Sequence, residues 1–168
     1  MAIVSSAKAG LAAAPRATIL QLRGAGLSAR EIEQEAMRLV ASSPIPVVIS
    51  SRCDLVLATQ AAGVNLPERD IAAREARALL GQRLVGRSVH SLEAARQAEE
   101  EGADYLVFGP VWKSPTHPDA PAVGVHALSE VAGTLKIPVL AIGGVTEECI
   151  ADCHAAGAAG YAAITLFR

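Results

Sequence analysis

The sequence predicts a (β/α)₈ barrel, a TIM barrel, that lacks its final helix. Eight short apolar runs alternate with amphipathic stretches along 168 residues, which is typical of alternating strands and helices. Most of these runs are continuously apolar, as in parallel strands that are covered on both faces. A glycine pair, Gly143-Gly144, follows the seventh run rather than the first. This late position favours a barrel over the alternative, a doubly wound open sheet.

The expected strands are short and rich in Val, Ile, Leu and Ala, and aromatic residues make up only 3% of the chain. Small side chains of this kind suit helices that pack closely on a parallel sheet. A chain of this length buries roughly 70% of its unfolded surface, so we treat residues 1–168 as a single barrel domain. The strands are expected at residues 2–6, 18–24, 46–51, 63–67, 83–89, 105–111, 138–144 and 160–167.

The helices are recognised by their amphipathic pattern and by their ends. Ser28 and Glu31 match a capping box, and Gly102 suits the position just after a helix. The helices are expected at residues 28–42, 53–61, 69–80, 91–102, 124–135 and 146–157. A helix over residues 8–16 is disfavoured, because the segment contains Gly10 and Pro15.

The sequence ends at Arg168, directly after the eighth expected strand, so no eighth helix is expected. Apolar surface beside the first and eighth strands would then face water, which is rare on a monomer. We therefore expect that face to be covered by a second copy of the chain, another partner or a fused domain.

Charge and composition exclude several classes of protein. A formal net charge of −2 and a pI near 6.1 argue against nucleic-acid binding, which needs clustered positive charge. No apolar run reaches the roughly 18 residues of a membrane span. Residues 1–10 lack the basic start and apolar stretch of a signal peptide, and three cysteines are typical of a reducing compartment. We expect a cytoplasmic protein that contacts neither nucleic acid nor membrane.

The glycine pair raises the question of a phosphate site. Barrels often bind phosphate on the loops after strands 7 and 8, where backbone N–H groups and a helix start attract an anion. Gly143 and Gly144 fit the first loop, and Ile164 N–H with the Thr165 hydroxyl fit the second. The alternative is structural, because a tight turn between strand and helix can simply require glycine.

Several motifs at the strand ends occur in the order of a known family. They are "ILQLR", "ISSRCDL", "GVNL", "ARALLG" and "GRSVHSLEAA", followed by the stretch from Gly102 to Phe167. Together they resemble the thiamin phosphate synthase/TenI family over nearly the whole chain. The resemblance implies a barrel enzyme with a small phosphorylated thiazole as its substrate.

Two activities are implied by this resemblance. Thiamin phosphate synthase joins hydroxymethylpyrimidine diphosphate to a thiazole phosphate, releases diphosphate and uses Mg²⁺. TenI-type members instead shift protons on a carboxythiazole phosphate and need no cofactor. Both hold the thiazole phosphate on the loops that here contain Gly143, Gly144, Ile164 and Thr165. The residues expected to line the substrate pocket are Gln21, Arg23, Arg52, Ser88, Ser114, Thr116 and His117.

The sequence departs from the family where the synthase reaction needs charge. Ala25 and His117 stand where the family has lysines, Ser51 replaces a metal-binding aspartate, and Asn65 replaces a histidine. Asp70 remains as the one expected metal ligand, for use only in a synthase-like reaction. Because Mg²⁺ prefers carboxylate and phosphate oxygens, this loss weakens the expected metal site.

His90 is the expected catalytic residue of a tautomerase. It follows the fifth strand, at the end of the barrel where catalysis takes place, and it matches the catalytic histidine of TenI-type members. An imidazole can give and take a proton near neutral pH. The alternative is that His90 caps the helix that begins near Ser91. We therefore favour a thiazole tautomerase, with thiamin phosphate synthase and a non-catalytic phosphate-binding barrel as alternatives.

Overall fold

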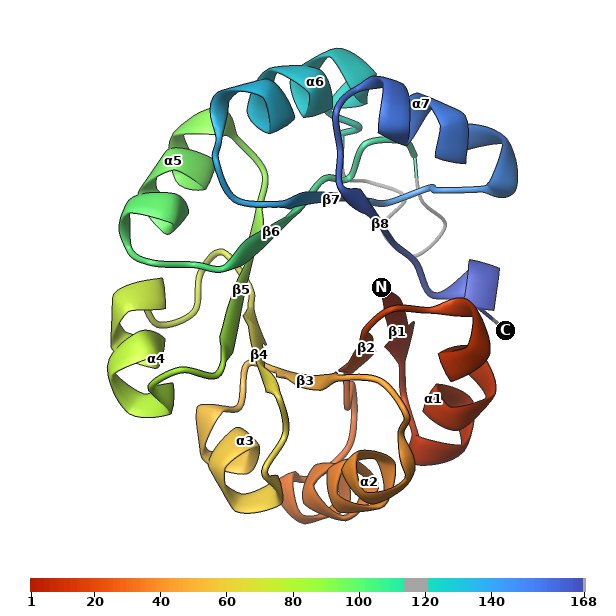
Figure 1. Cartoon of the computed structure of the whole chain (residues 1–168), viewed down its shortest axis with the longest axis vertical. Coiled ribbons are helices and arrows are strands. Elements are labelled where there is room, and N and C mark those ends of the chain that lie inside the picture. Colours follow the sequence, from red (N-terminus) through yellow and green to blue (C-terminus); the bar gives the residue numbers. More distant parts are fainter. Residues whose placement is uncertain (114–120, 168) are drawn as a thin grey trace.

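The computed structural model describes residues 1–113 and 121–167. Eight parallel strands form one sheet in sequence order, and a bridge between Ala2 and Ala163 brings its two edges together. The Ile3 N–H donates to the Ala163 carbonyl at 2.9 Å across this junction. Helices surround the ring of strands (Figure 1). The predicted (β/α)₈ barrel is confirmed.

Each expected strand has a counterpart in the barrel. The strands are β1 (Ala2–Val4), β2 (Leu20–Leu22), β3 (Val47–Ser50), β4 (Gly63–Leu66), β5 (Leu84–Val89), β6 (Tyr105–Phe108), β7 (Val139–Ile142) and β8 (Gly160–Ala162). The last strand is shorter than expected, because the chain turns into a 3₁₀ helix, η3 (Thr165–Phe167).

The helices follow the expected alternation with the strands. They are α1 (Ala7–Ala13), α2 (Ala29–Ser42), α3 (Cys53–Thr59), α4 (Ala73–Leu80), α5 (Leu92–Glu100), α6 (Gly124–Thr134) and α7 (Ile150–Ala155). Two further 3₁₀ helices are η1 (Ala14–Arg16) and η2 (Glu147–Cys149). Ser28 and Glu31 form the predicted capping box at the start of α2.

Helix α1 corrects one expectation, because a helix forms where Gly10 and Pro15 argued against it. Gly10 faces α2 so closely that a Cβ atom there would lie 2.6 Å from Leu39 Cδ1. The glycine therefore permits close packing of two helices, and this contact outweighs its low helix propensity. Pro15 lies in η1, after α1 has ended, where it breaks no α-helical hydrogen bond.

Side chains of the strands are buried on both sides of the sheet. One set fills the barrel interior and includes Ile3, Val48, Tyr105, Val107 and Ala162. The other set packs between the strands and the surrounding helices. Burial on both faces explains why the strands appear in the sequence as continuous apolar runs.

The face beside β1 and β8 is better covered than the sequence suggested. Ala2 is fully buried, and Val4 and Ala163 are less than a tenth exposed. In η3, Phe167 is buried and stacks on Tyr161 with ring centroids 6.1 Å apart. The outward side chains of these strands are thus largely covered by the chain itself. A covering partner stays a prediction.

Among the residues that the structure describes, no helix combines the length and the apolar character that crossing a membrane requires.

The barrel interior offers a sharp test of packing at Gly86. A Cβ atom on Gly86 would lie 2.1 Å from Cζ of Tyr105, which is itself buried. We expect Gly86→Ala to lower the free energy of unfolding by about 1–3 kcal/mol, because the ring has no space to move into. Urea denaturation measures this. Gly133→Ala is the control, since that Cβ would meet nothing within 4 Å in α6. It should raise stability by roughly 0.5 kcal/mol, and equal effects of the two variants would contradict the packing argument.

Candidate active site

The barrel brings most of the predicted site residues to one end. All strands run parallel, so their carboxyl ends and the loops that follow them lie at the same mouth of the barrel. The predicted residues placed there are Gln21, Arg23, Arg52, Asp70, Ser88, His90, Gly143, Gly144, Ile164 and Thr165. Ser114, Thr116 and His117 lie outside the described residues.

Two amide–hydroxyl pairs form a polar layer inside the barrel near this mouth. Gln21 Nε2 donates to Ser50 Oγ at 2.8 Å, and Asn65 Nδ2 donates to Ser88 Oγ at 3.0 Å. Both amides are buried, with 5% of Gln21 and 3% of Asn65 exposed. Sequence reasoning identified Gln21 and Ser88 but treated Asn65 only as a departure from the family. Its pairing depends on the register between neighbouring strands, for which the sequence contains no local signal.

Asn65 also has an unsatisfied acceptor. Its Oδ1 atom is buried and has no hydrogen-bond partner within the described part of the chain. A buried carbonyl oxygen without a partner is costly, so this position favours any ligand or water that brings an N–H or O–H donor.

His90 is exposed at the end of β5, and its ring has a defined orientation. Nδ1 makes a short contact with the Gly109 carbonyl oxygen. A carbonyl oxygen only accepts hydrogen bonds, so in a neutral ring this contact favours the tautomer with the proton on Nδ1 and the lone pair on Nε2. Helix α5 is capped instead by Ser91, whose Oγ accepts from the Ala94 N–H at 3.1 Å. The interpretation of His90 as a helix cap is therefore wrong.

The glycine pair after β7 has a structural reason. Gly143 and Gly144 have φ angles of +90° and +67°, and the segment after β6 crosses directly over them. A Cβ atom on Gly143 would lie 2.4 Å from Pro110 Cβ, and one on Gly144 would lie 2.4 Å from the Lys113 carbonyl oxygen. Glycine is therefore required at both positions whether or not a ligand binds.

The surroundings of the glycine pair still have the features of a barrel phosphate site. The register pairs Ile142 with Ala162, so the loops after β7 and β8 begin side by side. The short helix η3 starts at Thr165, with two residues between it and the end of β8. In many barrels the phosphate lies between these two loops and the start of such a short helix. The phosphate contact itself stays a prediction.

Arg52, at the end of β3, is already engaged by a carboxylate. Its guanidinium donates two hydrogen bonds to Asp54, at 2.8 Å from Nε to Oδ1 and 2.5 Å from NH2 to Oδ2. These hydrogen bonds lower the pKa of Asp54 and raise the pKa of Arg52. An anionic ligand at Arg52 must therefore compete with, or share, this pair.

Asp70 offers limited support for a metal ion. Its Oδ1 accepts from the Ile71 N–H at 2.8 Å. Within residues 1–113 and 121–167, no group of three or more His, Cys, Asp or Glu side chains is arranged to hold a metal. Proteins often hold Mg²⁺ with one or two carboxylates plus substrate phosphates. The residues present therefore fit only a Mg²⁺ ion that is bound mainly by a ligand's phosphates.

Cys53 lies close to these acidic residues and is not an activated nucleophile. Burial raises the pKa of its thiol, and the nearby charges of Asp70 and Asp54 raise it further. The thiol therefore stays protonated near neutral pH.

Comparisons with known proteins agree with the geometry. A family model described as thiamine monophosphate synthase matches residues 3–167. The chain is 38% identical over 152 residues to a "Putative thiamine-phosphate synthase 2" of Aquifex aeolicus, covering 89% of this chain and 82% of that protein. It is 37% identical over 153 residues to a thiamine-phosphate synthase of Chloroflexus aurantiacus, covering 89% and 71%.

A solved structure shows the same relationship in three dimensions. The thiamine phosphate pyrophosphorylase from Pyrococcus furiosus superposes with a TM-score of 0.86 at 30% identity, covering 95% of this chain and 79% of that one. The N-acetylmannosamine-6-phosphate 2-epimerase from Clostridium perfringens, at 17% identity and a TM-score of 0.73, shares the fold alone. Because the family model matches residues 3–167 and the relatives from Aquifex aeolicus and Chloroflexus aurantiacus are 37–38% identical, the chain belongs to the thiamine monophosphate synthase family.

Proposed function

We propose that this enzyme acts in thiamin biosynthesis and holds a phosphorylated thiazole at the C-terminal mouth of its barrel. The observation that carries the proposal is the paired start of the loops after β7 and β8, with η3 beginning at Thr165. Backbone N–H groups of these loops and the Thr165 hydroxyl are suited to a phosphate. The rest of the ligand would extend over the polar layer of Gln21 and Asn65.

The names of the relatives favour thiamine-phosphate synthesis as the reaction. In this reaction the bond between the pyrimidine methylene carbon and the diphosphate oxygen breaks, and a bond forms from that carbon to the thiazole nitrogen. Negative charge builds up on the departing diphosphate, so nearby cations favour the transition state. Arg52 and Arg23 are the cationic side chains that the ends of β3 and β2 supply. Mg²⁺, held by Asp70 and the diphosphate oxygens, would neutralise further charge.

A second candidate reaction is supported by the orientation of His90. A thiazole tautomerase needs one group that removes a proton from the ring system and returns it to another atom of the same substrate. With its proton on Nδ1, His90 presents the Nε2 lone pair for this purpose. The reaction needs no metal, which suits the single expected carboxylate, Asp70.

Calorimetric titration with and without Mg²⁺ separates the candidates. We expect thiazole phosphate to bind equally well with and without Mg²⁺, because backbone N–H groups and the Thr165 hydroxyl are proposed to bind its phosphate. Binding of hydroxymethylpyrimidine diphosphate that requires Mg²⁺ would support the synthase, and its absence would support the tautomerase. Failure of thiazole phosphate to bind at all would contradict the proposed function.

Replacement of His90 tests its role in proton transfer. If the chain is a tautomerase, His90→Ala should lower kcat by roughly 10²–10⁴-fold, since it removes the acid/base group. Thiazole phosphate binding should change less than threefold. His126→Ala, which removes an exposed histidine on α6, is the control and should leave both unchanged. Tautomerase activity that survives in His90→Ala would show that another group moves the proton.

Arg52 can be tested by removing the carboxylate that competes for it. Asp54→Asn should tighten the binding of inorganic diphosphate by up to about fivefold, because an exposed ion pair is worth about 0.2–1 kcal/mol. Glu100→Gln makes the same charge change at the far end of α5 and should have little effect. Diphosphate affinity that is equal in Asp54→Asn and the control would place the diphosphate away from Arg52.

A further inference from the structure

A buried arginine next to the active site has no assigned role. Arg87 lies on β5, between two residues that face the barrel interior, Gly86 and Ser88, so its own side chain points toward the surrounding helices. Only 9% of Arg87 is exposed. A buried charge is expensive unless it is compensated, and none of the ion pairs among the described residues includes Arg87.

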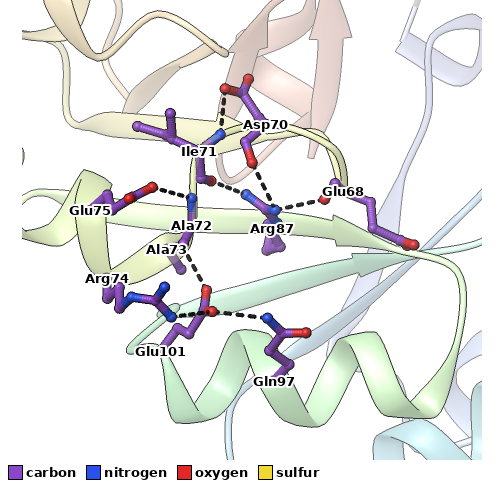
Figure 2. A network of polar contacts seen from close by, with 10 residues as sticks. All are labelled: Glu68, Asp70, Ile71, Ala72, Ala73, Arg74, Glu75, Arg87, Gln97 and Glu101. Atoms are coloured by element: carbon purple, nitrogen blue, oxygen red, sulfur yellow. Dashed lines mark hydrogen bonds and ion pairs between the residues drawn. The ribbon is translucent and has the colours of Figure 1, made fainter.

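The hydrogen bonds of Arg87 go to backbone carbonyl groups. NH2 donates to the carbonyl oxygens of Glu68 at 2.7 Å and Asp70 at 3.3 Å, and NH1 makes a short contact with the Ile71 carbonyl oxygen. Figure 2 shows the guanidinium facing these carbonyls. All three belong to the loop between β4 and α4. One planar guanidinium therefore holds the whole loop against β5, as its fork of donors allows.

The same loop reaches across to His90. The Glu68 carboxylate accepts a hydrogen bond from the His90 backbone N–H at 2.7 Å. On the other side, the His90 ring contacts the Gly109 carbonyl through Nδ1. His90 is thus fixed at its backbone from the β4 side and at its ring from the β6 side. The hydrogen bond that the His90 N–H donates to the Glu68 carboxylate is charge-assisted, which makes it stronger than one between neutral groups.

The loop also carries Asp70, whose backbone carbonyl is one of the three that Arg87 binds. Residues 67–72 belong to neither β4 nor α4, so regular secondary structure does not fix the position of this carboxylate. A shift of the loop would therefore move both Asp70 and the acceptor of the His90 N–H. The two groups with assigned roles in the candidate reactions depend on the same anchor.

We propose that Arg87 and Glu68 are positioning residues that together set the places of Asp70 and His90 at the mouth of the barrel. Arg87 holds the β4–α4 loop through its carbonyl groups, and Glu68 transfers that placement to the His90 backbone. The consequence for catalysis rests on the proposed function, because it takes His90 and Asp70 as site residues. The predicted effect on the positions of the loop and of His90 does not depend on the proposed function.

The tautomer of His90 gives a readout that needs no substrate. Nitrogen-15 NMR of the imidazole, on the ligand-free protein, distinguishes a proton on Nδ1 from one on Nε2. We expect the Nδ1–H form to dominate in the unmodified chain. In Glu68→Ala, the His90 backbone N–H loses its acceptor. The imidazole ring is then no longer held at a fixed distance from the Gly109 carbonyl, so the two tautomers should become comparable in population. Glu68→Gln keeps an acceptor oxygen and should restore the Nδ1–H form.

Enzyme kinetics provide the second readout. Glu68→Ala should lower kcat for proton transfer at least tenfold while KM changes less than threefold, and Glu68→Gln should recover most of the loss. Arg87→Met should also lower kcat, when activity is measured well below the melting temperature of that variant. Arg74→Met is the matched control, because Arg74 pairs with Glu101 at 2.8 Å in the same region but does not touch the loop carbonyls.

The outcomes separate the two proposals. If Glu68→Ala lowers the melting temperature as Arg74→Met does but leaves the His90 tautomer unchanged, the network is merely structural and the inference is overturned. This test uses only Glu68→Ala and its control. It does not require Arg87→Met to fold, although that variant removes a buried side chain. If the tautomer shifts as expected while the unmodified chain acts on neither thiazole substrate, the positioning role stands and the proposed function fails.

Discussion

Closure of the parallel sheet is the constraint on which the rest of this structure depends. The bridge between Ala2 and Ala163 joins the first strand to the residue that follows β8, so the ring of strands is nearly closed. Because every strand runs in the same direction, closure also gathers all the carboxyl ends at one mouth. Residues far apart in the chain, such as Gln21 and Thr165, are thereby brought to the same end of the barrel. The same closure thus encloses the core and gathers the candidate site residues at one end.

The interior of the ring combines apolar packing with a thin polar layer. Most inward side chains are apolar, and Gly86 leaves the space that the Tyr105 ring occupies. Close to the mouth, Gln21 donates to Ser50 and Asn65 donates to Ser88, while the buried Asn65 Oδ1 has no partner in the described part of the chain. Burial of polar groups costs stability, so a partly satisfied layer at this position is typical of a site that a ligand completes. The packed lower interior gives this layer a rigid support.

Two arginines at or near the mouth form hydrogen bonds with other groups of the chain. Arg52 pairs with Asp54, and Arg87 binds the carbonyl groups of the β4–α4 loop. These contacts hold loops in place, which favours reactions that depend on accurate placement of a few groups. His90 fits this description, because its backbone and ring are each held by a neighbouring strand end. A metal-dependent reaction would need the substrate's own phosphates to supply most of the ligands for Mg²⁺.

The sequence by itself determined the eight strands, most of the helices and the family. Apolar periodicity and short motifs are local features, so they can be recognised without knowledge of the fold. It also placed His90 and the glycine pair at strand ends. Only the tertiary structure decided what these residues contact. Helix α1 forms because Gly10 fits against Leu39, Gly143 and Gly144 are required by a crossing segment, and the roles of Asn65 and Arg87 come from neighbouring strands. Such contacts join residues distant in the chain, and a single sequence has no periodic signal that identifies the partner.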